Sequence, residues 1–124
     1  MFVNMLKSKI HRIVVTQTEL EYQGSITIDE TLARAAKLLA GERVLVADLR
    51  NGERFETYVI YGRRGSGTVC VNGAAAHLCE VGDEVIVMAF AWLTAEETKK
   101  YKPVIVKIAK GNRIKPKGRR QRSK

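Results

Sequence analysis

Residues 22–29 read Tyr22-Gln23-Gly24-Ser25-Ile26-Thr27-Ile28-Asp29, a pattern typical of a β-strand that contains one glycine-serine step. Glycine weakens the interior of a strand, and it often marks a position where backbone conformation or close approach matters. The segment from Met5 to Gln17 has a β-branched run at residues 13–16, so another strand is expected before this one. The first 29 residues therefore predict two β-strands, the second of which contains the Gly24-Ser25 dipeptide.

The Gly24-Ser25 step has a latent chemistry of its own. If the backbone bends suitably, the Ser25 hydroxyl can attack the carbonyl of Gly24 and convert the amide into an ester. β-Elimination would then cut the chain and leave dehydroalanine, whose hydrolysis gives a pyruvoyl group. Most glycine-serine steps are turns or bulges, so the dipeptide alone does not predict this reaction.

Turn and cap signals divide the following residues into short elements. Asp29 is a candidate N-cap for a helix over Glu30–Ala40, which Gly41 is expected to close. Asn51-Gly52 is a strong turn signal for a β-hairpin. The strands on either side of this turn are expected over residues 43–49 and 54–61.

The second half of the chain continues in the same way. Glu84 to Trp92 is a nearly continuous apolar run, which predicts a strand buried on both faces. Thr94 is expected to cap a short helix over residues 95–100, and Pro103 to Ile108 fits an edge strand. Six or seven short strands with two small helices and no internal repeat predict a mainly β barrel, with one domain over residues 1–98.

The charge of the chain is concentrated in its last quarter. The formal net charge is +9. Residues 99–124 hold twelve lysines and arginines and no acids, which leaves a net charge of −3 for residues 1–98. We expect the segment from residue 99 to be a basic tail, largely disordered from Lys110 onward.

Several classes of protein are disfavoured by what the sequence lacks. It has no apolar run near ~20 residues and no signal-peptide pattern, so we expect a cytoplasmic protein without a membrane span. Cys70 and Cys79 match no zinc spacing and are expected to be buried free thiols. We therefore expect no metal site.

Several separate motifs resemble the pyruvoyl-dependent aspartate 1-decarboxylases. They occur in the same order from Met5 to about Trp92 and comprise residues 5–12 (MLKSKIHR), 22–25 (YQGS), 51–58 (NGERFETY), 64–67 (RGSG), 71–77 (VNGAAAH) and 81–83 (VGD). The resemblance implies a six-stranded double-psi β-barrel and a homotetramer with sites near its subunit interfaces. It also implies self-cleavage between Gly24 and Ser25. The reaction implied is conversion of L-aspartate to β-alanine and CO2 for pantothenate synthesis.

The implied cofactor is the pyruvoyl group derived from Ser25. Decarboxylation of an α-amino acid leaves two electrons on Cα, which need an acceptor. In this family the substrate amine forms a Schiff base with the pyruvoyl ketone, and the electrons delocalise into it. Pyridoxal phosphate is not expected, because the chain shows no obvious phosphate-binding site for it.

The resemblance also assigns roles to individual residues. Tyr58 is implied as the proton donor to Cα, and Thr57 as a residue of both cleavage and substrate contact. Arg54 shares strand parity with Tyr58, and its guanidinium suits a carboxylate. The other implied site residues are Lys9, Gly73, Ala74 and Ala75 for substrate binding, and His11, Tyr22 and Asn72 for shaping the site.

Two other functions compete with this one. The basic tail is compatible with a nucleic-acid-binding barrel, but the body has no aromatic-rich binding face, so no specific nucleic-acid partner is expected. An uncleaved barrel that acts only as an interaction module is the second alternative. Mass measurement under denaturing conditions separates both from the enzyme, which gives two fragments. The sequence leaves open whether a maturation factor speeds the cleavage.

Overall fold

The computed structural model describes residues 1–116 of the chain. The elements in chain order are β1 (Phe2–Val14), β2 (Gln17–Glu19), β3 (Ser25–Asp29), α1 (Glu30–Ala35), β4 (Arg43–Asp48), β5 (Arg54–Gly62), β6 (Val69–Asn72), the 3-10 helix η1 (Gly73–His77), β7 (Glu84–Thr94), α2 (Ala95–Lys100), β8 (Val104–Ala109) and β9 (Arg113–Ile114).

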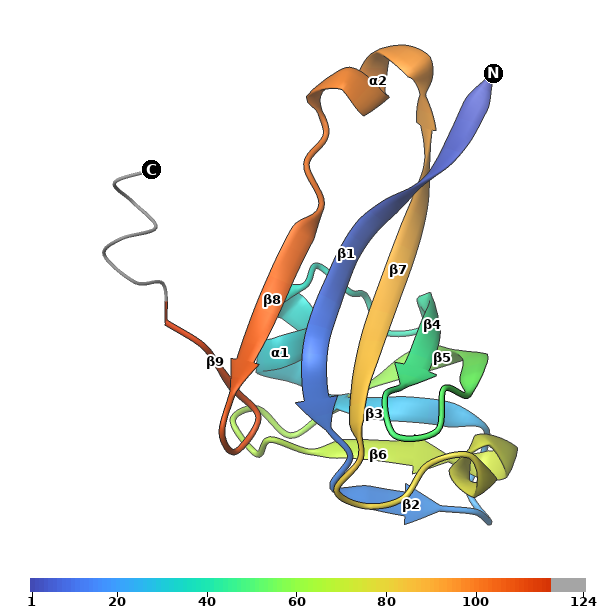
Figure 1. Cartoon of the computed structure of the whole chain (residues 1–124), viewed down its shortest axis with the longest axis vertical. Coiled ribbons are helices and arrows are strands. Elements are labelled where there is room, and N and C mark those ends of the chain that lie inside the picture. Colours follow the sequence, from blue (N-terminus) through green and yellow to red (C-terminus); the bar gives the residue numbers. More distant parts are fainter. Residues whose placement is uncertain (117–124) are drawn as a thin grey trace.

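The strands join in the order β2-β6-β3-β5-β4-β7-β1-β8-β9. The long antiparallel pair of β1 and β7 stands upright with β8 beside β1, while β3, β6 and β2 cross beneath it (Figure 1). The predicted mainly β class with small helices is confirmed. The expected count of six or seven strands was too low, since the described residues contain nine. The additional strands include the three-residue β2 and the two-residue β9.

The core lies on one face of the long strands. On β7 the side chains of Val85, Val87 and Ala89 are buried, and they alternate with partly exposed residues. Phe90 and Trp92 are 41% and 68% exposed on the other face. The prediction that this strand is buried on both faces was wrong. Its neighbours β1 and β4 are antiparallel to it, and residues 1–116 cover only one face of this part of the sheet.

The Gly24-Ser25 step lies at the beginning of a strand and not inside one. Both β2 and β3 pair with β6, one on each side of it, so the chain must turn around the end of β6 between them. Residues 20–24 form this exposed connection, and β3 begins at Ser25. The expected strand over residues 22–29 is therefore shorter, and the peptide bond between Gly24 and Ser25 joins a loop to a buried strand.

The first helix is also shorter than expected. Asp29 caps α1 as predicted, and its side chain accepts a hydrogen bond from Thr31 N. The helix ends at Ala35 instead of Ala40, because Lys37 takes a left-handed conformation with φ of 60° and turns the chain toward β4. Within residues 1–116 no helix is long and apolar enough to cross a membrane.

Two other local predictions are confirmed. Asn51-Gly52 connects β4 to its antiparallel partner β5, and Gly52 has a positive φ of 75°. Thr94 caps α2 through a capping box, in which its side chain accepts from Glu97 N and Glu97 accepts from Thr94 N.

The segment after residue 98 belongs to the fold as far as residue 116. Strand β8 pairs in parallel with β1, and Val106 on it is buried in the core. Asn112 then fastens the turn between β8 and β9: its side chain accepts from Val14 N (2.8 Å) and donates to Val14 O (2.8 Å) and Gly67 O (2.9 Å). Disorder from Lys110 was therefore wrong for residues 110–116, and residues 117–124 lie outside the described residues.

We expect Asn112→Ala to lower the free energy of unfolding by about 2–4 kcal/mol. The substitution leaves buried backbone groups of Val14 and Gly67 without partners and places alanine at a φ of 55°. A denaturant titration measures the effect. Arg113→Ala, an exposed change on β9 next to Asn112, is the control and should change stability by less than about 0.5 kcal/mol. Equal stability of the two variants would contradict this role of Asn112.

Candidate active site

Ser25 is fully buried, and its hydroxyl has two hydrogen-bond partners. Its Oγ accepts a hydrogen bond from Asn72 Nδ2 at 3.0 Å and donates to the carbonyl oxygen of Gln23 at 3.0 Å. Ser25 and Asn72 lie opposite each other on the antiparallel strands β3 and β6, which explains why their side chains meet. The hydroxyl is thus held in one direction beside the bond that precedes it.

Gly73 packs directly against the backbone of Gly24. A β-carbon placed on Gly73 would lie 2.6 Å from Gly24 Cα and 2.9 Å from Gly24 N, and Gly73 has a φ of 77°. Both observations require glycine at this position. Gly24 itself has no positive φ and has open space around an added β-carbon. The contact therefore requires glycine at position 73 but not at position 24.

Tyr58 lies on the strand next to Ser25. β3 runs parallel to β5 with Ile26 opposite Val59, so Ser25 and Tyr58 each come one residue before the same rung. Side chains alternate along both strands, and Ile26 and Val59 are buried in the core, so Ser25 and Tyr58 share the other face. The register therefore brings these two predicted site residues together within one chain.

Arg54 and Thr57 occupy different faces of β5, as their parity predicted. Arg54 is exposed at the start of the strand, on the face that carries Tyr58. Thr57 lies opposite Val44 on the face toward the core. Among the hydrogen bonds of residues 1–116, none joins Thr57 to Gly24, so the role of Thr57 in cleavage stays a prediction.

Lys9 lies far from Ser25 along the sheet. Lys9 is opposite Met88, Met88 is opposite Leu45, and Leu45 is opposite Glu56 on β5. With β3 one strand further, Lys9 and Ser25 are about four strand spacings apart, or roughly 19 Å along the sheet. Lys9 and Ser25 therefore lie on different parts of the sheet, and among residues 1–116 no hydrogen bond joins Lys9 to the groups around Ser25.

His11 lies two residues after Lys9 on β1, opposite Lys107 of β8. Burial lowers the pKa of His11, and the positive charges of Lys9, Arg12 and Lys107 lower it further. Its Nδ1 atom is buried and has no hydrogen-bond partner among residues 1–116. His11 is therefore neutral at physiological pH and, like Lys9, remote from Ser25 in the chain.

The remaining predicted residues lie near Gly24. Tyr22 is 54% exposed in the loop before β3, and its carbonyl oxygen lies close to Gly73. Ala74 is exposed and Ala75 half-buried in η1, which begins at Gly73 directly after Asn72. Short helices leave their first N–H groups without intrahelical acceptors, so small residues here keep backbone donors accessible beside the Gly24-Ser25 bond.

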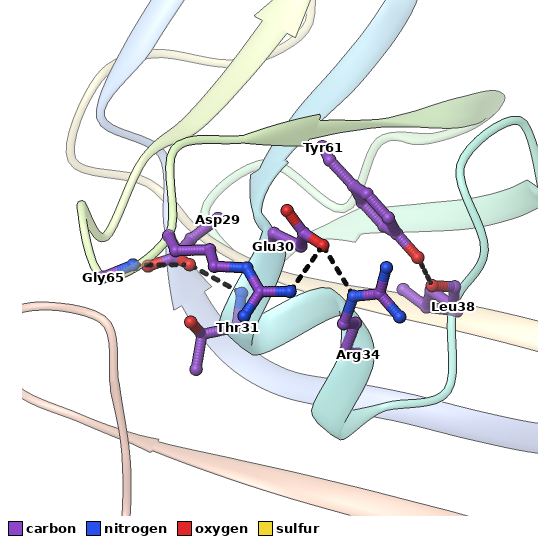
Figure 2. Close-up of polar contacts among 8 residues, drawn as sticks. Asp29, Glu30, Thr31, Arg34, Leu38, Tyr61 and Gly65 are labelled. Carbon is purple, nitrogen blue, oxygen red and sulfur yellow. Dashed lines mark hydrogen bonds and ion pairs between the residues drawn. The ribbon is translucent and has the colours of Figure 1, made fainter.

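The far end of β3 is anchored independently of its beginning. Asp29 Oδ1 accepts from Thr31 N (2.8 Å) and Gly65 N (3.0 Å) (Figure 2). Asp29 Oδ2 accepts from Gly67 N (2.8 Å). Burial alone would raise the pKa of Asp29, but these hydrogen bonds outweigh it and lower the pKa. An ionised Asp29 thus holds β3 in place whatever happens at Ser25.

The next residue extends this anchor to the surface. Glu30 lies between Arg34 (2.6 Å) and Arg64 (3.1 Å), and Arg34 stacks over the ring of Tyr61 with its Cζ atom 5.2 Å from the ring centre (Figure 2). These are surface ion pairs of modest energy. They fix helix α1 against β5 and have no contact with Ser25.

A second group of shifted titratable residues lies before β7. Arg50 lowers the pKa of Asp83 to about 2, with Nε 2.7 Å from Asp83 Oδ1. Burial and the Asp83 charge raise the pKa of Asp48, and burial with Asp48 raises that of Cys79 to about 12. Shifted pKa values often mark functional sites. Here the ion pair with Arg50 and a hydrogen bond from Glu80 N to Asp83 give the cluster a structural role.

Sequence reasoning missed two residues beside Ser25. Cys70 Sγ lies 3.1 Å from Asn72 Oδ1, and Asn72 Nδ2 lies 3.0 Å from Thr27 Oγ1. The parity of the strands contained the signal, since Thr27 is two residues after Ser25 and Cys70 two before Asn72.

Known proteins with similar sequences share one family. The family model described as aspartate decarboxylase matches residues 1–115. The chain is 58% identical to aspartate 1-decarboxylase of Caldicellulosiruptor saccharolyticus over 92% of this chain and 89% of that one. It is 55% identical to the protein of the same name from Porphyromonas gingivalis, over 86% and 90%, and 54% identical to that from Clostridium beijerinckii, over 93% of each.

These matches place the chain among the decarboxylases, which are lyases. It belongs to the aspartate decarboxylase family. Among solved structures, the rationally designed protein mkDPBB_sym_86 is similar at 15% identity with a TM-score of 0.47, over 64% of this chain and 91% of that one.

Proposed function

We propose that the protein converts L-aspartate to β-alanine and CO2 with a pyruvoyl group that it makes by cutting its own chain between Gly24 and Ser25. The observation that carries the proposal is the setting of Ser25. Its buried hydroxyl is held by Asn72 at the junction of an exposed loop and a doubly paired strand, with Gly73 packed on Gly24. The named relatives are aspartate 1-decarboxylases.

The surrounding strands fit a cut at this bond. Residues 26–28 of β3 are paired on both sides, and Asp29 anchors the end of the strand. The fragment before the cut keeps β1 and β2 in the sheet through β7, β8 and β6. Both fragments therefore stay folded together, with the new chain end at Ser25. When present, the pyruvoyl group supplies a ketone that accepts the electron pair left on the substrate Cα when CO2 departs.

The residues of the chain would bind and orient aspartate around this position. Arg54 offers a guanidinium for a substrate carboxylate, and the backbone from Gly73 to Ala75 offers N–H donors. Tyr58, on the face and strand next to Ser25, would deliver its hydroxyl proton to Cα after CO2 has left. Thr57 and Tyr22 would line the site, and no metal or pyridoxal phosphate is needed for these steps.

We propose a homotetramer in which neighbouring subunits complete each site. Two observations support this. Lys9 and His11 lie four strands from Ser25 in the sheet order, which favours their reaching a substrate from another subunit. The face that carries Lys9 also exposes Phe90 and Trp92. These two aromatic side chains line a cavity of about 270 Å³ together with polar and charged residues, and exposed aromatic side chains beside polar ones suit an interface. We further propose a cytoplasmic enzyme that supplies β-alanine for pantothenate synthesis.

Incubation of the purified protein with L-aspartate tests the proposed reaction. We expect equal amounts of β-alanine and CO2 without added pyridoxal phosphate or metal. A carbonyl reagent such as hydroxylamine should abolish this activity, because it blocks a ketone. Activity that requires added pyridoxal phosphate, or that survives the reagent, would contradict the proposal.

We expect Arg54→Ala to cut its chain normally but to raise the KM for aspartate at least about tenfold. The substitution removes a charge-assisted contact to a carboxylate, and Arg54 is exposed on β5, so folding should be unaffected. Arg63→Ala, an exposed arginine in the loop after β5, is the matched control. Unchanged rates at low aspartate for Arg54→Ala would show that another group binds the substrate.

A further inference from the structure

The carboxamide of Asn72 makes three side-chain hydrogen bonds around Ser25. Its two Nδ2 protons go to Ser25 Oγ and Thr27 Oγ1, both at 3.0 Å, and its Oδ1 accepts from Cys70 Sγ at 3.1 Å. Asn72 is 2% exposed, Cys70 6% and Ser25 fully buried, so the bonds that join these three residues are shielded from water, while Thr27 is half-buried. The four side chains form a closed set across strands β3 and β6.

The orientation of the Asn72 carboxamide follows from the other hydrogen bond of Ser25, which its Oγ makes with the Gln23 carbonyl. The carbonyl oxygen of Gln23 has no proton, so Ser25 Oγ must donate to it at 3.0 Å. Ser25 Oγ can then only accept from Asn72, which must present Nδ2 and turn Oδ1 toward Cys70. A neutral thiol is a donor to that oxygen, and burial together with Glu19 raises the pKa of Cys70, so the thiol keeps its proton.

We propose that Cys70 and Thr27 are positioning residues that hold the Asn72 carboxamide with Nδ2 toward Ser25 Oγ, where it assists self-cleavage. The inference rests on the proposed function and adds to it two residues that never touch the substrate. Thr27 accepts the second Nδ2 proton, and Cys70 donates to Oδ1. Together they disfavour the flipped amide, which would offer an acceptor to Ser25.

A donor at Ser25 Oγ assists the second of the two covalent steps of cleavage. In the first step Oγ bonds to the Gly24 carbonyl carbon, the Gly24–Ser25 C–N bond breaks, and the Oγ proton ends on the released amine. In the second step Ser25 Cα loses its proton to solvent and the Cβ–Oγ bond breaks, so Oγ leaves as part of the Gly24 carboxylate. Water then adds to the imine form of the dehydroalanine, and the nitrogen leaves as ammonia, which gives the ketone. Negative charge grows on Oγ in the second step, and the Asn72 N–H stabilises it.

The test follows the cleavage of freshly prepared full-length chain by mass over time. We expect Cys70→Ala to cut about three- to tenfold more slowly than the wild type, the effect of one lost hydrogen bond. Cys70→Ser keeps a donor and should restore most of the rate. Cys79→Ala removes the other buried thiol, which lies before β7, and should cut at the wild-type rate.

A double substitution separates positioning from packing. If Cys70 acts only through Asn72, Cys70→Ala should not slow further a chain that already carries Asn72→Ala. The infrared S–H band of Cys70, measured in uncut Cys79→Ala chain, should also shift to higher frequency with Asn72→Ala, and this readout does not depend on how well Cys70→Ala folds. An unshifted band, a wild-type rate in Cys70→Ala, or equal slowing in both backgrounds overturns the positioning role alone. A wild type that stays uncut contradicts the proposed function and this inference with it.

Discussion

Replacing Tyr58 with phenylalanine is expected to slow β-alanine formation at least about 100-fold while the chain still cuts itself and binds aspartate. The ring and its packing on β5 remain, but the one transferable proton is lost. This is the usual scale for removal of a general acid. Cleavage should continue, because it depends on the Ser25 hydroxyl and the groups that hold it, and Tyr58 makes none of those hydrogen bonds.

Tyr61→Phe is the matched control for this prediction. Tyr61 is three residues further along β5 on the other face, and its hydroxyl donates to Leu38 O at 2.7 Å. Its loss should cost stability, on the order of 1 kcal/mol, without changing turnover. The measurement is β-alanine formation by fully cut protein, followed with fragment mass. Turnover near the wild-type rate in Tyr58→Phe would mean that water or another group delivers the proton.

Gly73→Ala is expected to stop or slow self-cleavage at least about tenfold. The new β-carbon would lie 2.6 Å from Gly24 Cα, so the backbone on one side must shift. The loop over residues 20–24 is exposed and is the part able to move, which displaces the Gly24 carbonyl from the Ser25 hydroxyl. A displacement of this size is costly for a reaction that depends on close alignment.

Gly82→Ala provides the control for backbone strain. Gly82 has a φ of 98°, but a β-carbon there meets nothing within 4 Å. Both substitutions therefore place alanine at a positive φ, which costs about 1–2 kcal/mol of stability. Only Gly73→Ala adds a close contact with Gly24, beside the bond to be cut. The fraction of full-length chain after a fixed incubation reports the difference. Equal cleavage in the two variants would show that the contact of Gly73 with Gly24 does not align the bond for cleavage.

Local signals predicted those parts of the fold whose cause is local. The Asn51-Gly52 turn and the Thr94 cap depend on the residues themselves, and both are confirmed. The length of β3 depends on how the chain passes around β6, and the place of residues 104–116 depends on pairing with β1. These long-range contacts leave no local signature in the sequence. The sequence therefore predicts too long a strand at β3 and a folded part that ends before residues 104–116.

In the candidate site, too, the sequence predicted the local relations between residues but not the long-range ones. Strand parity alone predicted that Arg54 and Tyr58 share a face and that Thr57 does not. The register that puts Tyr58 beside Ser25, and the rungs that separate Lys9 from it, required the sheet order. Cys70 and Thr27 were missed because a buried thiol and a strand threonine are common in any core, and only their distances to Asn72 single them out.

The mass of the purified protein under denaturing conditions shows whether the chain cuts itself at Gly24-Ser25. We expect two fragments, residues 1–24 and 25–124, the second lighter by one ammonia than a serine-ended chain and able to react with hydroxylamine. Ser25→Ala should remain a single, folded, inactive chain, because no hydroxyl is left to form the ester. A wild-type chain of full length that still makes β-alanine, or two fragments from Ser25→Ala, would contradict this expectation.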